Sequence, residues 1–280
     1  MRVPFTKMHG AGNDYVYVNG FEVKLADPAA VARLVSPRHR GIGSDGLIVI
    51  QPSEIAHCRM EMYNADGSRG EMCGNGIRCV GKYVFEHGIA REKIIRVETD
   101  AGVKALELET AAGLVTRVTV DMGEPILDPP RIPVRAETPR VVDLPLDVGG
   151  TTWRITCVSM GNPHCVVFVP EVSSLDLPAI GPGFEHHEIF PRRVNTELVE
   201  VLSRRELRMR VWERGSGETE ACGTGACAAA VAGVLTGRAE RRVTIHLLGD
   251  DLEIDWRESD GHVTMRGEAV EVYRGEIEIP

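Results

Sequence analysis

The chain has 280 residues, which is long for one domain and suits two domains of about 140 residues each. Its formal net charge of −9 argues against a polyanionic partner such as nucleic acid, and the sequence contains no dense run of Lys or Arg. The seven cysteines are odd in number and too dilute for a disulfide scaffold.

Compartment and partners follow from the same features. The N-terminus, Met1-Arg2-Val3-Pro4, soon becomes polar, unlike a secretory leader. The longest uncharged run, 221–237, is rich in Ala and Gly and favours a buried helix over a membrane span. We therefore expect a cytoplasmic protein with a small-molecule partner and neither a nucleic-acid nor a membrane partner. A homodimer is one option for its assembly.

In the first half, short β-branched and aromatic runs predict strands. These runs are Tyr15–Val18, Leu47–Ile50 and Ile94–Val97. Apolar residues recur at helical spacing after Cys73, which predicts a helix that stops at Gly88. Segments 103–109 and 115–120 predict a hairpin.

In the second half, five prolines crowd residues 125–139 and predict a linker or crossover. Cys165–Val169 predicts a strand, and segments 252–256 and 262–265 predict another hairpin. The segment after Cys222 predicts a helix ending at Gly237; because it is apolar on nearly every face, we expect protein all around it. The closing run 270–279 has strand character and no counterpart in the second half.

An internal duplication relates the two halves, because Cys73 and Cys222 lie 149 residues apart in matching surroundings. The matching segments are Glu71-Met72-Cys73-Gly74-Asn75-Gly76 and Glu220-Ala221-Cys222-Gly223-Thr224-Gly225. The same offset maps Gly12-Asn13 onto Gly161-Asn162, Arg59-Met60 onto Arg208-Met209, Tyr63 onto Trp212 and Gly88 onto Gly237. We therefore predict one domain from residues 1–124, joined by the C-terminal strand 268–280, and a second from residues 125–267.

A cysteine at the first turn of a helix, followed by Gly-x-Gly, has two chemical advantages. The unpaired N–H groups and partial positive charge there favour thiolate over thiol. The glycines let the backbone approach an anion, so the same amides can hold a substrate carboxylate. Two such helix ends facing one another would place a sulfur on each face of the neighbouring carbon. The pattern predicts a two-base proton transfer by Cys73 and Cys222, both partly exposed and low in pKa.

Other chemistries fit the sequence less well. A pyridoxal enzyme needs a Schiff-base lysine and a phosphate cradle, and no Lys has such a setting, so no cofactor is expected. Zinc would require closely spaced cysteine pairs with further Cys or His, so no metal is expected. The remaining cysteines are interpreted as small core residues: Cys58, Cys79, Cys157, Cys165 and Cys227.

The repeat also nominates binding groups. Asn64 and Glu213 occupy equivalent positions, each nine residues ahead of its cysteine, and Arg214 follows Glu213. Taken singly, each is more often a turn residue or a surface charge. In this loop, however, Arg214 can pair with a carboxylate through two hydrogen bonds, and Glu213 can receive an ammonium group. His164 lies in a repeated loop and is a candidate for tuning a thiol.

Several long motifs, in order along essentially the whole chain, resemble those of the diaminopimelate epimerase family. They are Lys7–Asp14, Tyr63–Ser68, Met72–Cys79, Gly161–His164, Glu213–Thr219 and Ala221–Gly225. The resemblance implies an isomerase that needs no cofactor and interconverts LL- and meso-2,6-diaminoheptanedioate, for lysine and peptidoglycan precursors. It implies an α/β fold of two pseudo-symmetric domains, each a mostly antiparallel sheet wrapped around a central helix, with the site between them.

The resemblance also assigns roles to residues. It makes Cys73 and Cys222 the acid/base pair, with His164 and Glu213 adjusting the pKa values of their thiols. The substrate's polar groups, especially at its distal end, would be held by Asn13, Asn64, Asn162, Asn195 and Arg214. The reacting carboxylate would be held by Gly74-Asn75 and Gly223-Thr224.

One position departs from the family pattern, and two alternatives stay open. The family often has Gln after the Asp of Gly-Ile-Gly-x-Asp, whereas this chain has Gly46 after Asp45; a backbone group or water is expected to replace the amide. A two-cysteine racemase of proline or hydroxyproline is the nearest competitor, but it leaves Arg214 and the asparagines unexplained. The other alternative is a non-catalytic redox switch or amino-acid-binding protein. Solvent deuterium incorporation at the α-carbon would distinguish an epimerase from that protein.

Overall fold

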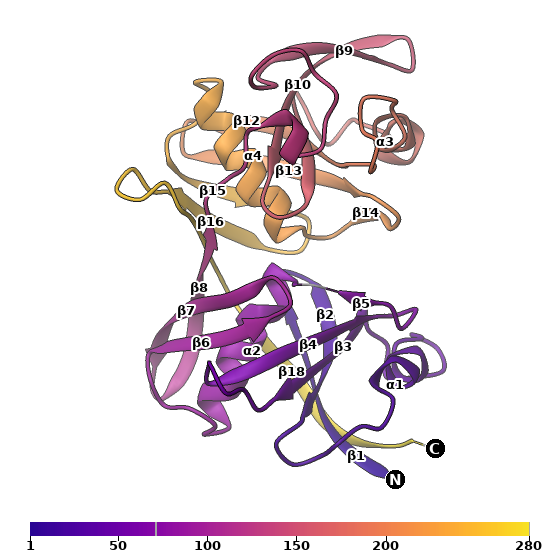
Figure 1. The fold of residues 1–280 in the computed structure, drawn as a ribbon, viewed down its shortest axis with the longest axis vertical. Coiled ribbons are helices and arrows are strands. Elements are labelled where there is room, and N and C mark those ends of the chain that lie inside the picture. Colours follow the sequence, from indigo (N-terminus) through magenta and orange to yellow (C-terminus); the bar gives the residue numbers. More distant parts are fainter. Residues whose placement is uncertain (71, 280) are drawn as a thin grey trace. The chain divides into compact units, whose positions relative to one another are not determined.

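The computed structural model describes residues 1–70 and 72–279; Glu71, at the start of the first cysteine motif, and Pro280 lie outside the described residues. The chain divides into two compact units, Met1–Val120 with Arg266–Pro280 (unit 1) and Asp121–Met265 (unit 2). It passes from one unit to the other within two strands, β8 (Leu114–Gly123) and β17 (Val263–Gly267) (Figure 1).

Unit 1 is a mostly antiparallel sheet with strand order β18-β1-β2-β3-β4-β6-β7-β8, in which only the β2–β3 and β4–β6 pairs are parallel. The short strand β5 pairs with β4. The remaining bounds are β1 Arg2–Gly10, β2 Asn13–Asn19, β3 Gly46–Gln51, β4 Cys58–Asn64, β5 Arg69–Gly70, β6 Ile94–Thr99, β7 Gly102–Ala111 and β18 Val270–Glu278. Helix α2 (Gly74–Glu86) packs against β1, β2, β4, β6 and β7, and α1 (Pro28–Val35) packs against β3 and β4.

Unit 2 repeats this pattern with strand order β9-β10-β11-β12-β13-β15-β16, in which β11–β12 and β13–β15 are the parallel pairs. The bounds are β9 Leu144–Val148, β10 Thr151–Ser159, β11 Pro163–Val169, β12 Asn195–Ser203, β13 Glu206–Glu213, β14 Gly217–Thr219, β15 Arg242–His246 and β16 Asp251–Trp256. Helix α4 (Gly223–Leu235) packs against β10, β11, β12, β15 and β16. It is the orange helix in Figure 1. The unit also holds α3 (Leu177–Glu185) and the short 3₁₀ helix Pro129–Arg131.

The two central helices begin and end at equivalent residues. Cys73 and Cys222 are their N-caps, each with an extended backbone. One residue beyond each C-cap comes a glycine with positive φ, 73° at Gly88 and 70° at Gly237, a conformation that ends a helix without strain on a side chain. The predicted helices are confirmed, and α4 is buried along nearly its whole length as its composition indicated.

The predicted α/β fold class is confirmed, since each unit is a mostly antiparallel sheet packed around its central helix. The hairpin of β7 and β8 forms as predicted, with Ala112 and Gly113 at positive φ in its turn. In the second half β16 and β17 both form, and the N–H of Arg257 donates to the carbonyl of His262 at 2.9 Å between them.

The proline-rich segment 125–139 is not a bare linker. Ile132 and Val134 are buried in the core of unit 2, which also contains Val167 and Phe184. Ile126 forms a bridge with Ser159 at the end of β10. The prolines correctly indicated irregular backbone, but the apolar residues Ile132 and Val134 are as fully buried as residues of a core strand.

Candidate active site

Cys73 sits in unit 1, half-buried, at the start of α2. Its Sγ accepts from the N–H of Gly76 at 3.3 Å and donates to Oδ1 of Asn13 at 3.1 Å. Tyr15 lies nearby on β2; burial and then the neighbouring Cys73 thiol raise the pKa of Tyr15 well above its usual value. Cys73 is therefore held by one helix amide and one side-chain amide.

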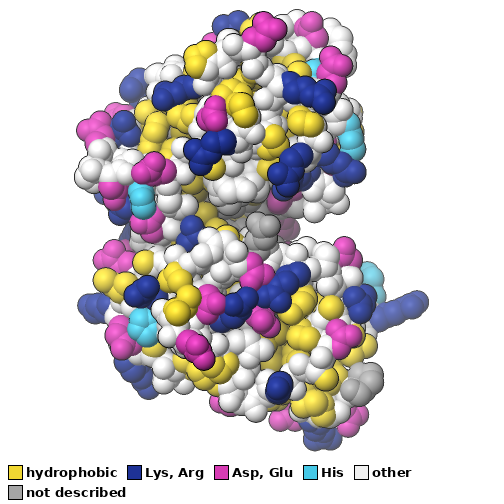
Figure 2. Space-filling view, in the orientation of Figure 1, with side chains coloured by type: hydrophobic (Ala, Val, Ile, Leu, Met, Phe, Trp, Pro, Cys, Tyr) yellow, Lys and Arg dark blue, Asp and Glu magenta, His cyan; other side chains and the backbone are white. Residues whose placement is uncertain are grey.

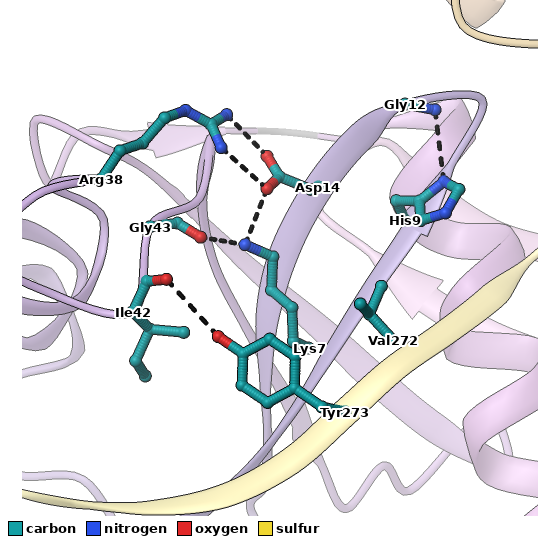
Figure 3. A pocket seen from close by; sticks show the side chains of 9 residues that line it. All are labelled: Lys7, His9, Gly12, Asp14, Arg38, Ile42, Gly43, Val272 and Tyr273. Carbon is teal, nitrogen blue, oxygen red and sulfur yellow. Dashed lines mark hydrogen bonds and ion pairs between the residues drawn. The ribbon is translucent and has the colours of Figure 1, made fainter.

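A charged network behind Asn13 fixes that contact. Asn13 Nδ2 donates to Asp45 Oδ2 at 2.7 Å, and Arg38 bridges Asp45 at 2.9 Å to Asp14 at 2.9 and 3.0 Å. Lys7 Nζ lies 2.7 Å from Asp14 and donates to the Gly43 carbonyl (Figure 3). Although burial opposes it, Arg38 and Lys7 lower the pKa of Asp14. Three members of the network, Lys7, Asp14 and Arg38, line an open cavity of about 350 Å³ within unit 1.

Cys222 sits in unit 2 at the equivalent helix end, but only 5% of it is exposed. Its Sγ lies 3.5 Å from Thr224 Oγ1. Burial, and then the carboxylates of Glu213 and Glu197, raise the pKa of the Cys222 thiol well above its ordinary value.

The expectation of a partly exposed, low-pKa thiol is therefore wrong for Cys222. Hydrogen bonds from Thr224 and the backbone of Gly225 do favour the thiolate there. They are outweighed, because removing the thiolate from water and placing it beside two carboxylates both disfavour the charged form. Sequence spacing located the helix end but could not show what surrounds it.

His164 is fully buried between two side chains that fix its ring. Nδ1 lies 2.7 Å from Glu197 Oε1, and Nε2 lies 3.0 Å from Asn162 Oδ1. Asn162 Nδ2 in turn donates to Thr224 Oγ1 at 3.2 Å. The sequence-predicted residues Asn162, His164, Cys222 and Thr224 thus form one connected cluster in unit 2.

This cluster also offers ligand types that metals accept. One atom each of His164, Glu197 and Cys222 lie within 4.8 Å of one another. Both ring nitrogens of His164 are already engaged, however, and neither can turn to an ion without breaking a buried hydrogen bond. We interpret the cluster as a hydrogen-bonded acid/base network.

Glu213, Arg214 and Asn195 meet at the end of β13. Asn195 is 2% exposed, and its Oδ1 accepts from the N–H of Arg214 at 2.9 Å. The Arg214 side chain is exposed and donates to the Arg192 carbonyl at 3.1 Å. Glu213 accepts from Thr219 Oγ1 at 2.5 Å, and burial raises the pKa of Glu213. The Glu213 carboxyl group therefore lies beside the Cys222 thiol, and Arg214, the next residue in the chain, has an exposed side chain.

Asn64 and Gly46 are direct partners across the β3–β4 pair. Asn64 is half-buried, and its Nδ2 donates to Ser68 Oγ at 2.9 Å. A Cβ atom at Gly46 would lie only 2.1 Å from the carbonyl oxygen of Tyr63. The backbone here excludes any side chain, which accounts for the missing amide.

The helix-end residues differ in what they present. Asn75 is 2% exposed and its Oδ1 accepts from Arg78 Nη1 at 3.1 Å, so its side chain is committed within unit 1. Gly74 and Gly223 are the first helical residues. Contact with a carboxylate at these positions would come from backbone N–H groups.

Sequence reasoning missed three residues of the two cysteine sites: Tyr15 beside Cys73, Glu197 beside Cys222, and Asp45, which holds Asn13. The duplication offered a signal for two of them, since Tyr15 aligns with His164 and Ile48 with Glu197. Glu197 is fully buried on β12, and a fully buried glutamate is unusual.

Comparison with known proteins identifies the family. The family model described as diaminopimelate epimerase matches residues 5–127 and 156–272. Curated diaminopimelate epimerases from Desulfovibrio desulfuricans and Acetivibrio thermocellus are 58% and 56% identical, each with 98% of both chains covered.

Solved structures show how widely the fold is used. A probable proline racemase from Agrobacterium radiobacter has a TM-score of 0.73 at 15% identity, covering 99% of this chain and 93% of that one. A PhzF-family phenazine biosynthesis protein from Bacillus anthracis has a TM-score of 0.69 at 16% identity, covering 100% of both chains. These likenesses concern the fold alone, whereas the identities above 50% extend over 98% of this chain. The chain therefore belongs to the diaminopimelate epimerase family and is an isomerase.

Proposed function

We propose that this chain interconverts LL- and meso-2,6-diaminoheptanedioate with Cys73 and Cys222 as the two acid/base groups. The observation that carries the proposal is the matched pair of helix ends, each capped by one of these cysteines. Each unit supplies one sulfur and one set of helix amides. Two such helix ends facing one carbon would remove a proton on one face and return a proton on the other.

In the proposed step, one thiolate takes the α-proton, so the C–H bond breaks and an S–H bond forms. The electron pair left on carbon moves into the substrate carboxylate. Helix N–H groups at Gly74-Asn75 and Gly223-Thr224 would hold that carboxylate, and such a donor is worth about 3–4 kcal/mol in known oxyanion sites. The opposite thiol then delivers its proton, and the enzyme is left with thiol and thiolate exchanged.

We infer that substrate specificity comes from groups around these helix ends. Asn13, Asn64, Asn162 and Asn195 would bind the polar groups, and the exposed guanidinium of Arg214 would bind the distal carboxylate through two hydrogen bonds. Glu213 would receive an ammonium group, and Glu213 and His164 would adjust the thiols. Cyclic proline-like substrates would leave Arg214 and these amides without partners.

We propose a role in lysine and peptidoglycan precursor synthesis in the cytoplasm, without a cofactor and without nucleic acid. Figure 2 shows acidic and basic side chains interspersed over the visible face of each unit. Among the described residues, no helix is both long and apolar enough to cross a membrane. We further propose that residues 1–124 with 268–280, and 125–267, act as the two functional halves.

A homodimer is also proposed. On the strand β18, Val270 is 36% exposed and Val272 is 53% exposed; as alternate residues they share one face of the strand, where apolar side chains favour a self-contact. Sedimentation analysis tests this; a monomer at micromolar concentration would contradict it.

The deciding experiment is solvent deuterium exchange at the α-carbon of LL- and meso-diaminopimelate. Wild type should incorporate deuterium and epimerise both, and Cys73→Ala and Cys222→Ala should epimerise neither. Cys79→Ala is the matched control, because the duplication already places Ala228 at the equivalent position. Full activity in either of the first two variants would refute the two-base assignment.

A further inference from the structure

The duplication places unlike residues at equivalent positions around the two cysteines. In unit 1, β2 and β3 run parallel and carry Tyr15 and Ile48. In unit 2, β11 and β12 pair in the same register and carry His164 and Glu197. The scaffold is repeated, but its chemistry is not.

Two equivalent glycines show how closely the scaffold is kept. A Cβ added at Gly76 would lie 2.7 Å from Ile48 Cδ1, and one added at Gly225 would lie 2.7 Å from Glu197 Oε1. Gly76 and Gly225 also occupy the same turn of their helices, three residues after the cysteine. The Glu197 carboxylate therefore takes the place that an apolar methyl group fills beside Cys73.

Glu197 is poorly satisfied for a buried carboxylate. It is 0% exposed, and its Oε1 pairs with His164 Nδ1 at 2.7 Å. Oε2 is buried and has no hydrogen-bond partner among the described residues. Burying a polar oxygen without a hydrogen-bond partner opposes folding, so its presence indicates a role other than stability.

Titratable groups lie on β13 and on the strands that pack against α4, the helix that begins after Cys222. Glu197 on β12 and Glu213 on β13 are the acidic neighbours, and both raise the pKa of the Cys222 thiol, after burial. From β11 come His164 and the buried thiol Cys165, and from β10 the buried thiol Cys157. On β15 and β16, His246 and Asp251 pair with one another at 2.7 Å near the surface. Of these carboxylates, Glu197 alone contacts His164.

We propose that Glu197 is a positioning residue that holds His164 and keeps a carboxylate beside Cys222, at the place where unit 1 has the apolar side chain of Ile48. The hydrogen bond between Glu197 and Nδ1 fixes the orientation of the His164 ring, so that Nε2 points at Asn162. The second oxygen of Glu197 has no competing hydrogen-bond partner in the part of the chain that the structure describes. The inference rests on the proposed role of Cys222 in proton transfer, but its electrostatic part is measurable without turnover.

The test is the pH dependence of iodoacetamide labelling at each cysteine, followed by peptide mass spectrometry, in wild type and Glu197→Gln. Removing a negative charge stabilises the thiolate, so the labelling curve of Cys222 moves to lower pH. The labelling rate near neutral pH rises about threefold or more, which corresponds to about half a pKa unit. The curve of Cys73 stays where it is and serves as an internal control.

Two further variants make the result specific. Glu200→Gln removes a carboxylate from the same strand, where Glu200 pairs with Arg208 at 3.3 Å, and should leave the Cys222 curve unchanged. Glu197→Asp retains the charge and should return the curve most of the way to wild type. It also provides the measurement if Glu197→Gln does not fold, because the shorter side chain withdraws the carboxylate from Cys222 and should move the Cys222 curve to slightly lower pH than in wild type.

The pH profile of kcat/KM gives the corresponding catalytic readout. The limb that reports Cys222 should move to lower pH in Glu197→Gln, which a purely structural loss of activity would not produce. An unmoved or upward-shifted Cys222 curve would overturn the inference, as would equal shifts at Cys73 and Cys222. If Cys222→Ala proved active, the proposed function would fail while the labelling result still stood.

Discussion

Gly46 offers a sharp test of whether backbone packing explains the chain's departure from its family. A Cβ atom there would lie 2.1 Å from the Tyr63 carbonyl oxygen and 2.9 Å from Tyr15 Cε1. Because ordinary contacts are near 3.5 Å, Gly46→Ala would force β3 and β4 apart by roughly 1 Å. We expect a loss of about 2–3 kcal/mol in the free energy of unfolding, as for overpacked cores, and a fall of about 5–10 °C in Tm.

Gly70→Ala is the matched control. There the added Cβ would lie 2.4 Å from the terminal methyl of Met62, a flexible group that can turn away. We expect a stability within about 0.5 kcal/mol of wild type. Because Gly46 pairs with Asn64, Gly46→Ala should also raise KM by displacing that side chain. Urea unfolding and steady-state kinetics measure both effects, and equal stabilities of the two variants would refute the reasoning.

Three other outcomes follow. Arg214→Lys should raise KM for diaminopimelate about tenfold, because a point charge cannot reproduce a planar two-pronged contact; unchanged kinetics would assign the distal carboxylate elsewhere. Asp45→Ala should raise KM several-fold and alter Cys73 labelling, because Asn13 loses the acceptor that lies 2.7 Å away; a wild-type labelling curve would contradict this. Mild oxidant should link Cys73 to Cys222 reversibly, and slowly, since the pKa of Cys222 is raised; peptide mapping that found a Cys79–Cys227 bridge instead would contradict it.

The sequence predicted most of the fold because its signals are local. Alternating β-branched runs and the Cys-Gly-x-Gly helix starts depend only on nearby residues, and both central helices begin where predicted. The packing of Ile132 and Val134 was not predictable, because it depends on a core assembled from distant strands. Proline content predicts where regular secondary structure stops, but it does not predict whether the residues between the prolines are buried.

The candidate site was predictable in its members but not in their electrostatics. Offset matching found Cys222, Asn162, His164 and Glu213, because the duplication keeps positions. Offset matching could not predict the raised pKa of the Cys222 thiol, because this pKa depends on burial and on carboxylates such as Glu197, which lies on β12. Helix-end charge is a local property, whereas desolvation belongs to the whole fold.

If a proton binds more tightly at Cys222 than at Cys73, the rates of the reaction change, but thermodynamics limits how they can change. The equilibrium between the two stereoisomers fixes the ratio of the two kcat/KM values, so Glu197 cannot favour one direction of reaction. It can bias the free enzyme toward the form with the proton on Cys222, by about 1.4 kcal/mol for each pKa unit. After each turnover the protons must redistribute before the same isomer can react again. Glu197→Gln should therefore change kcat at saturating substrate, and the pH at which each direction is fastest, while the ratio of the two kcat/KM values at any one pH stays as in wild type. A changed ratio, measured with both isomers in the same buffer, would show that the variant's rates report something other than a single reversible proton transfer.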